Sequence, residues 1–231
     1  MENSTIEEID YSEFKNNSKR AKNAITIFWV ICILNAFNIV INYLHYTIPF
    51  TLPFQIEMLL RPMVYMTSVL LFLMWFYRAH KNLHVLKVHG LNYGKNASIW
   101  YFFIPLANLV IPYHITVEIF EETQEKIRQS RKDFKINWDS NFIGIWWGLF
   151  IITKLIDSAF RDKVSLTNTE LSIFSNPIIY YDVVSILASI ATALVIRKIM
   201  KVEDVLREVV HEQAFLKPIQ TEDKVTDLNK D

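Results

Sequence analysis

An unbroken run of 21 uncharged residues, from Ala24 to Leu44, constrains this chain more than any other feature of its sequence. A membrane-spanning helix needs about 20 apolar residues to cross roughly 30 Å of hydrocarbon. The apolar core of a cleavable signal peptide is shorter, about 7–15 residues, and precedes a small-residue cleavage site. The run meets neither condition of a signal peptide, so it predicts a retained membrane span.

Four further apolar runs follow, at about residues 58–77, 97–117, 142–160 and 177–196. The composition agrees with them, because 52% of the residues are hydrophobic and the charged residues gather in blocks between the runs. The mean hydropathy of +0.18, the single Cys and the net charge of zero argue against a disordered chain, a disulfide scaffold and a basic nucleic-acid-binding domain. We therefore predict an all-α, polytopic membrane helix bundle.

The third run differs from the others because Pro105 and Pro112 interrupt it, with Asn108 between them. Each proline removes a backbone donor and clashes with the preceding helical turn. Lipid cannot satisfy the carbonyls that are freed, so protein or water has to shield them. Residues 97–117 are therefore either a kinked fifth span or a re-entrant segment that enters and leaves on one side.

The positive-inside rule separates these two topologies. If residues 97–117 cross, the basic residues near the spans divide ten to ten between the two sides. If they do not cross, eighteen share the side of the N-terminus and only Arg161 and Lys163 lie opposite. This favours four transmembrane helices, a re-entrant third run and both termini in the cytoplasm. The eighteen are Lys15, Lys19, Arg20, Lys22, Arg78, Lys81, Lys87, Lys95, Lys126, Arg128, Arg131, Lys132, Lys135, Arg197, Lys198, Lys201, Arg207 and Lys217.

The same patterning divides the chain into three parts: a cytoplasmic N-terminal segment at 1–23, a membrane domain at 24–197, and a cytoplasmic helix with a disordered tail at 198–231. A heptad-like stripe supports the cytoplasmic helix. The stripe either packs on its own protein or makes a homodimer. Its members are Ile199, Val202, Leu206 and Val209.

Five charged residues fall within the predicted spans or at their outer ends, at similar depth in the outer leaflet. Charges in a span are costly and usually face the interior of the bundle. Lys154 and Asp157 are i, i+3 neighbours that can neutralise each other. The cluster is either a site for a small polar ligand, ion or proton, or an ion-pair network that pins the helices together. Its members are Glu57, Arg61, Lys154, Asp157 and Asp182.

Motifs of soluble enzymes are missing: the sequence has no phosphate loop, no G-x-S-x-G and no H-E-x-x-H. His80 and His84 are spaced for one helical face, but with no Cys or carboxylate nearby in sequence we expect surface histidines rather than a metal site. We expect no enzyme activity, no metal and no cofactor. The polar stripe of Asn35, Asn38 and Asn42 on the first span is explained by hydrogen bonds between helices.

A series of motifs runs through residues 75–147. It reads W-F-Y-R-A-H-K-N-L from Trp75, F-I-P-L-A-N-L-V-I-P-Y from Phe103, and ends in the pair Trp146-Trp147. The series resembles a family of bacterial integral membrane proteins, the domain of unknown function 4328 family. The resemblance implies a multi-span protein of the bacterial inner membrane, and it brings no known activity, substrate or cofactor.

We expect residues of these motifs to hold the proline-interrupted run, residues 97–117, against the second span. We call this run the broken run and these residues the clamp. The aromatic residues suit the membrane interface, and the Arg suits the phosphate zone beside it. Either Asn82 and Asn108 hydrogen-bond the carbonyls freed by the prolines, or Arg78 instead pairs with Glu118, since both fall on the cytoplasmic side. The residues of this clamp are Trp75, Tyr77, Arg78, Asn82, Pro105, Asn108, Pro112 and Glu118.

The function that we favour from the sequence is a membrane-embedded binding, scaffold or sensory module that works through cytoplasmic partners. The alternative is a small transporter or channel that uses the broken segment 100–113 and the outer charge cluster. The expected partners are the lipid bilayer and a homodimer or a cytoplasmic protein, with no nucleic acid and an unknown ligand.

Overall fold

The computed structural model describes the backbone of residues 10–47, 52–161 and 177–228, and the side chains of 10–44, 59–159 and 179–215. Within these ranges every regular element is a helix and no strand occurs. The elements are η1 (Tyr11–Glu13), α1 (Ser18–Thr47), α2 (Leu52–Val85), α3 (Ala97–Trp100), η2 (Ala107–Leu109), α4 (Ile111–Ser130), α5 (Asn141–Arg161) and α6 (Pro177–Leu228).

Four of these helices, α1, α2, α5 and α6, are long and apolar enough to cross a membrane. This confirms the prediction of an all-α bundle with four transmembrane helices. Residues 97–117 are not among the spans found in the described ranges. The chain is therefore a multi-pass integral membrane protein.

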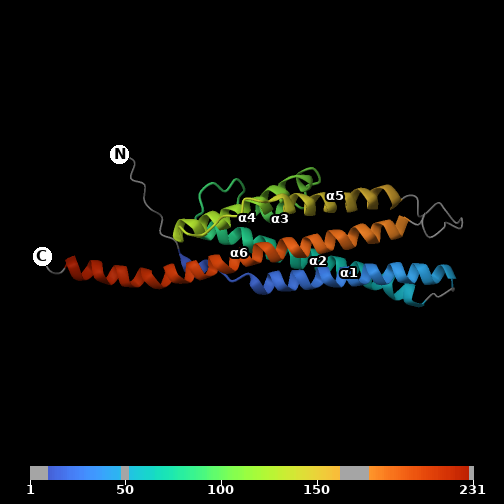
Figure 1. The fold of residues 1–231 in the computed structure, drawn as a ribbon, viewed down its shortest axis with the longest axis horizontal. Helices are drawn as coiled ribbons and strands as arrows, with labels where there is room; N and C mark the ends of the chain where they lie inside the picture. Colours follow the sequence, from blue (N-terminus) through green and yellow to red (C-terminus); the bar gives the residue numbers. More distant parts are fainter. Residues whose placement is uncertain (1–9, 48–51, 162–176, 229–231) are drawn as a thin grey trace.

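The four long helices lie side by side along the long axis of the molecule (Figure 1). We call the end where α1 leads to α2, and α5 to α6, the hairpin end. We call the opposite end, which carries α4 and the second half of α6, the charged end. α6 packs against α1, α5 and α4, whereas α2 packs mainly on α1, so the backbones of α2 and α5 do not come close along their length.

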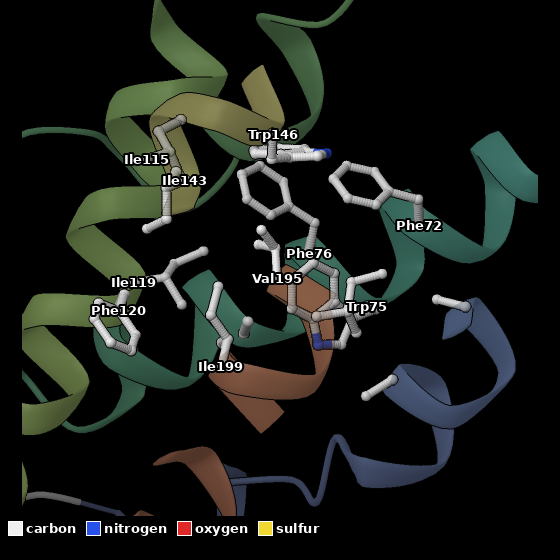
Figure 2. Packing of buried hydrophobic residues seen from close by; sticks show 14 of the residues in the cluster. Phe72, Trp75, Phe76, Ile115, Ile119, Phe120, Ile143, Trp146, Val195 and Ile199 are labelled. Atoms are coloured by element: carbon white, nitrogen blue, oxygen red, sulfur yellow. The ribbon is translucent and has the colours of Figure 1, made fainter. Parts of the chain in front are cut away.

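Aromatic side chains bridge the space between α2 and α5. The Phe72 ring stacks on Phe76 with centroids 5.5 Å apart and lies 6.1 Å from the ring of Trp146. Figure 2 shows these rings with branched aliphatic side chains from α4, α5 and α6 packed beside them. Rings offset in this way add to the energy of simple burial. Trp75 belongs to this core and is fully buried, and its place at the membrane interface stays a prediction.

The proline-containing run is broken in the structure. It consists of the four-residue α3, turns over residues 101–106, the short η2, and the start of α4 at Ile111. Pro112 lies in the first turn of α4, where a missing N–H costs nothing because no intrahelical acceptor is due there. The entry of this run into the membrane stays a prediction.

The predicted stripe on the charged end of α6 packs within its own chain. Ile199, Leu206 and Val209 are 0%, 2% and 2% exposed, and the last two lie in a cluster with Leu86 and Ile127. α6 itself continues unbroken through the predicted boundary at 197–198. The stripe is thus covered by its own chain, and a homodimer, which stays a prediction, would have to use another surface.

Candidate functional site

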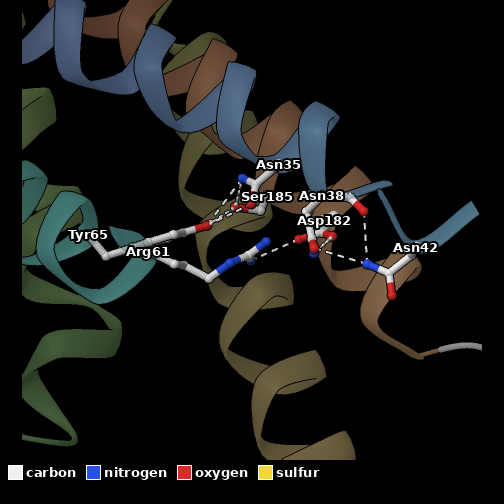
Figure 3. Close-up of polar contacts among 7 residues, drawn as sticks. All are labelled: Asn35, Asn38, Asn42, Arg61, Tyr65, Asp182 and Ser185. Atoms are coloured by element: carbon white, nitrogen blue, oxygen red, sulfur yellow. Dashed lines mark hydrogen bonds and ion pairs between the residues drawn. The ribbon is translucent and has the colours of Figure 1, made fainter. Parts of the chain in front are cut away.

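A buried ion pair ties α2 to α6 near the hairpin end. An Arg61 guanidinium nitrogen lies 3.0 Å from the carboxylate of Asp182, whose side chain has no exposed surface. The Asn38 amide of α1 donates to the other oxygen of the same carboxylate at 2.6 Å, and Asn42 donates to the Asn38 side-chain oxygen at 2.9 Å (Figure 3). The charge of Asp182 is thus both neutralised and hydrogen-bonded.

A second polar link joins the same three helices toward the charged end. The Asn35 amide donates to the Ser185 hydroxyl at 2.9 Å, and the Tyr65 hydroxyl lies 2.9 Å from that oxygen and donates to Asn35 at 3.2 Å (Figure 3). The polar stripe of α1 therefore serves hydrogen bonds between helices, as its spacing indicates.

The other predicted members of the charge cluster behave differently. Among the described side chains, the contact recorded for Lys154 is with a ring rather than with Asp157: its ammonium lies 5.5 Å from the centroid of the Phe150 ring. Asp157 is half-buried on α5, and the side chain of Glu57 lies outside the described residues. Of the five charges, the structure pairs Arg61 with Asp182.

Glu118 is held at the charged end by partners that the sequence analysis missed. Its carboxylate lies 3.2 Å from Nε2 of His80 and accepts the backbone N–H of Asn92 at 2.7 Å. The predicted pair of Arg78 with Glu118 is therefore wrong. His80 is fully buried, so its expected surface position is also wrong. Burial, and then the Glu118 carboxylate, raises the pKa of Glu122 one turn further along α4.

Asn82 binds the N-terminal segment rather than a freed carbonyl. Its amide donates to the backbone oxygen of Lys15 at 2.9 Å, and its oxygen accepts the Lys15 N–H at 3.3 Å. Next to it, the Asn17 amide donates to the carbonyl of Trp75 and to the carboxylate of Glu203, both at 3.1 Å. These bonds fix residues 15–17 against α2 and α6.

The broken run is held by the tryptophan pair of α5. The Trp147 indole N–H donates to the backbone oxygen of Leu109 at 2.8 Å, and the Trp146 indole donates to Thr192 of α6 at 2.9 Å. Trp147 thus supplies a donor to a backbone carbonyl of the broken run, and the Trp pair in the sequence motif was the signal for it. The Asn108 side-chain oxygen is buried without a hydrogen-bond partner.

The remaining clamp residues divide between the inside and the surface. Pro112 is buried, Tyr77 and Arg78 are half-buried, and Pro105 is exposed. His80 and His84 face each other with ring centroids 4.7 Å apart. Among the described side chains, no three His, Cys, Asp or Glu residues lie together in a way that would hold a metal ion.

A cavity of about 310 Å³ adjoins the polar link of Tyr65 and Ser185. Every membrane helix and the broken run contribute to its wall. One part of the wall is aromatic, with Phe72, Phe102, Trp146, Trp147 and Phe150. The other part carries hydroxyl groups, with Tyr65, Ser68, Ser185, Ser189 and Thr192. This is the concave, mostly apolar kind of site with a few polar groups that small molecules occupy.

Comparison with known proteins adds one match. A family model described as "Domain of unknown function (DUF4328)" covers residues 54–201. No curated protein and no solved structure matches the chain.

Replacing Trp147 with Phe should loosen the broken run. The Leu109 carbonyl would lose its donor in an apolar setting, which costs about 1–3 kcal/mol of unfolding free energy. Denaturant titration in detergent would measure the loss, and hydrogen exchange should rise over residues 101–111. Trp138→Phe is the control, because Trp138 is 60% exposed. Equal behaviour of the two variants would contradict the assigned bond.

Replacing Asp182 with Leu should destabilise the bundle more than replacing both partners of the ion pair. The single change leaves the Arg61 charge without this carboxylate, a loss of about 3 kcal/mol. The double variant Arg61→Met/Asp182→Leu should recover most of that loss in the same titration. A double variant as unstable as the single one would show that the pair is not the main interaction of Asp182.

Proposed function

Because the chain belongs to the domain of unknown function 4328 family, which brings no activity with it, we propose a function from the site: a membrane-embedded binding module that works through its cytoplasmic face. The family match runs from α2 into α6 and includes every wall of the cavity except that of α1. We propose a binding role rather than an enzyme.

The cavity is the observation that carries this proposal. A space of about 310 Å³ inside a small bundle loses packing contacts that neighbouring side chains would otherwise make. Tightly packed membrane helices need no such space, because close packing is what holds them together. A ligand that fills the cavity would restore those contacts, which supports a binding role.

The broken run supports a link from the cavity to the charged end. Phe102, Phe103 and Asn108 line the cavity, and the chain continues from there directly into α4. α4 is in turn bound to α6 through Arg131, which contacts the Glu212 carboxylate at 2.6 Å. A ligand that moves the broken run would therefore also move α4 against α6.

The basic residues support a cytoplasmic charged end in a bacterial inner membrane. The hairpin end has few Lys and Arg near it, whereas segment 86–96, α4 and the second half of α6 gather many at the other end. This is the bias expected of loops that stay inside.

A small transporter or channel is the second candidate. Broken backbone beside a cavity in the membrane favours it, since many transporters bind substrates at discontinuous helices. Asp182 does not add to that case, because Arg61 and Asn38 already hold its carboxylate. We therefore rank transport below binding.

Filling the cavity should remove a bound molecule. Native mass spectra of protein released from mild detergent should show a small-molecule adduct on the wild type, and Ala188→Trp should lose it, because Ala188 lines the cavity. Leu187→Trp is the matched control, since Leu187 is 49% exposed on the outside of the same helix. A wild type without an adduct, or an adduct that Ala188→Trp retains, would count against the binding module.

Cysteine labelling tests the orientation. In a Cys32→Ser background, Gln129→Cys at the end of α4 should react with an impermeant maleimide only after intact cells are opened. Thr47→Cys at the end of α1 should react from outside without opening. The reverse pattern would overturn the cytoplasmic placement of the charged end.

A further inference from the structure

The cavity has one cationic side chain in its wall, Lys154 of α5. Lys154 lies well inside the apolar part of α5, six residues before the end of the predicted span at 160. Among the described side chains no carboxylate pairs with it, and its recorded partner is the face of the Phe150 ring. A charged side chain at this depth is costly, and such residues commonly mark a ligand site.

The shape of the cavity favours a chain over a compact ligand. On α6 its lining extends from Tyr181 to Thr192, eleven residues that rise about 16 Å along the helix axis. Lys154 lies at the same end as Tyr181, and the rings of Trp146 and Trp147 lie toward the other end. A cation at one end and aromatic walls along the rest suit an amphiphile with an anionic head.

The cavity opens at the outer surface of the bundle, between α2 and the broken run. Val69 of α2 and Phe103 of the broken run line it and are themselves 51% and 66% exposed. The backbones of α2 and α5 are not packed together there. A molecule dissolved in the bilayer can therefore reach the cavity sideways, with no route through water.

We propose that the cavity binds a single-chain amphiphile with an anionic head, whose carboxylate or phosphate pairs with Lys154 and whose apolar chain lies against Phe72, Trp146 and Trp147. This inference rests on the proposed binding module and names the chemistry of its ligand. In the low dielectric of the membrane, a charge-assisted bond from an ammonium to an oxyanion is worth more than a neutral one. The proposal also gives Lys154 a counter-charge, which no carboxylate among the described side chains supplies.

The test compares two probes of equal length, dodecanoate and dodecanol, bound to the detergent-solubilised full chain and titrated by native mass spectrometry. Dodecanoate should bind the wild type at least about tenfold more tightly than dodecanol. Lys154→Met should remove that preference, and Lys154→Arg should keep it. Lys198→Met is the matched control: Lys198 also lies over a ring, 3.8 Å from the Phe142 centroid, but it does not line the cavity. Dodecyl phosphate in place of dodecanoate then separates a phosphate head from a carboxylate head.

The outcomes separate this inference from the function it rests on. Equal binding of both probes, blocked by Ala188→Trp and unaffected by Lys154→Met, would overturn the anionic ligand while leaving the binding module standing. Binding of neither probe, together with no adduct on the wild type, would overturn both. Loss of dodecanoate binding in Lys198→Met to the same degree as in Lys154→Met would mean a general surface charge effect, and this too would overturn the proposal.

Discussion

Polar groups that this chain carries into the membrane have to find their partners inside the protein, because hydrocarbon supplies none. At the hairpin end the requirement is met by Asp182, which accepts bonds from Arg61 on α2 and Asn38 on α1. The broken run, whose entry into the membrane stays a prediction, has the Trp147 indole as a donor to its Leu109 carbonyl. Each of these bonds joins elements that are distant in sequence, so the arrangement of the helices follows from them as much as from apolar packing.

Much of the fold could be predicted from the sequence, and the reason is physical. The length of an apolar run is set by the thickness of the bilayer, so runs such as Ala24–Leu44 identify spans without knowledge of their neighbours. The break in the third run was predictable because proline acts on its own backbone. The sequence predicted Arg61 and Asp182 only as members of a larger charge cluster. The position of a residue along its helix indicates its depth in the bilayer, but it does not show which neighbouring helix the side chain faces.

The clamp was harder to predict, because its contacts depend on how each helix is rotated about its axis and on which of several polar groups each side chain bonds. Arg78 and Glu118 lie at the same end, yet Glu118 meets His80 and Asn92, which neither charge nor spacing singles out. A Trp side chain combines a large apolar ring with one N–H donor, so a Trp in the sequence does not indicate which backbone carbonyl its indole will bond. The cavity could not be predicted from the sequence, because it is the space that packed side chains leave unfilled.

The bonds from α1 to α6 also bear on the order in which the protein is made. Asn38 is 144 residues before its partner Asp182, and Asn17 is 186 residues before Glu203. The first span is therefore synthesised before the carboxylate that its Asn38 amide bonds in the finished protein. Neighbouring polar groups, such as the Asn42 amide and the Asn38 carbonyl, can satisfy each other in the meantime. The native contacts of α1 with α6, at Asp182 and at Glu203, therefore stay incomplete until α6 has been synthesised.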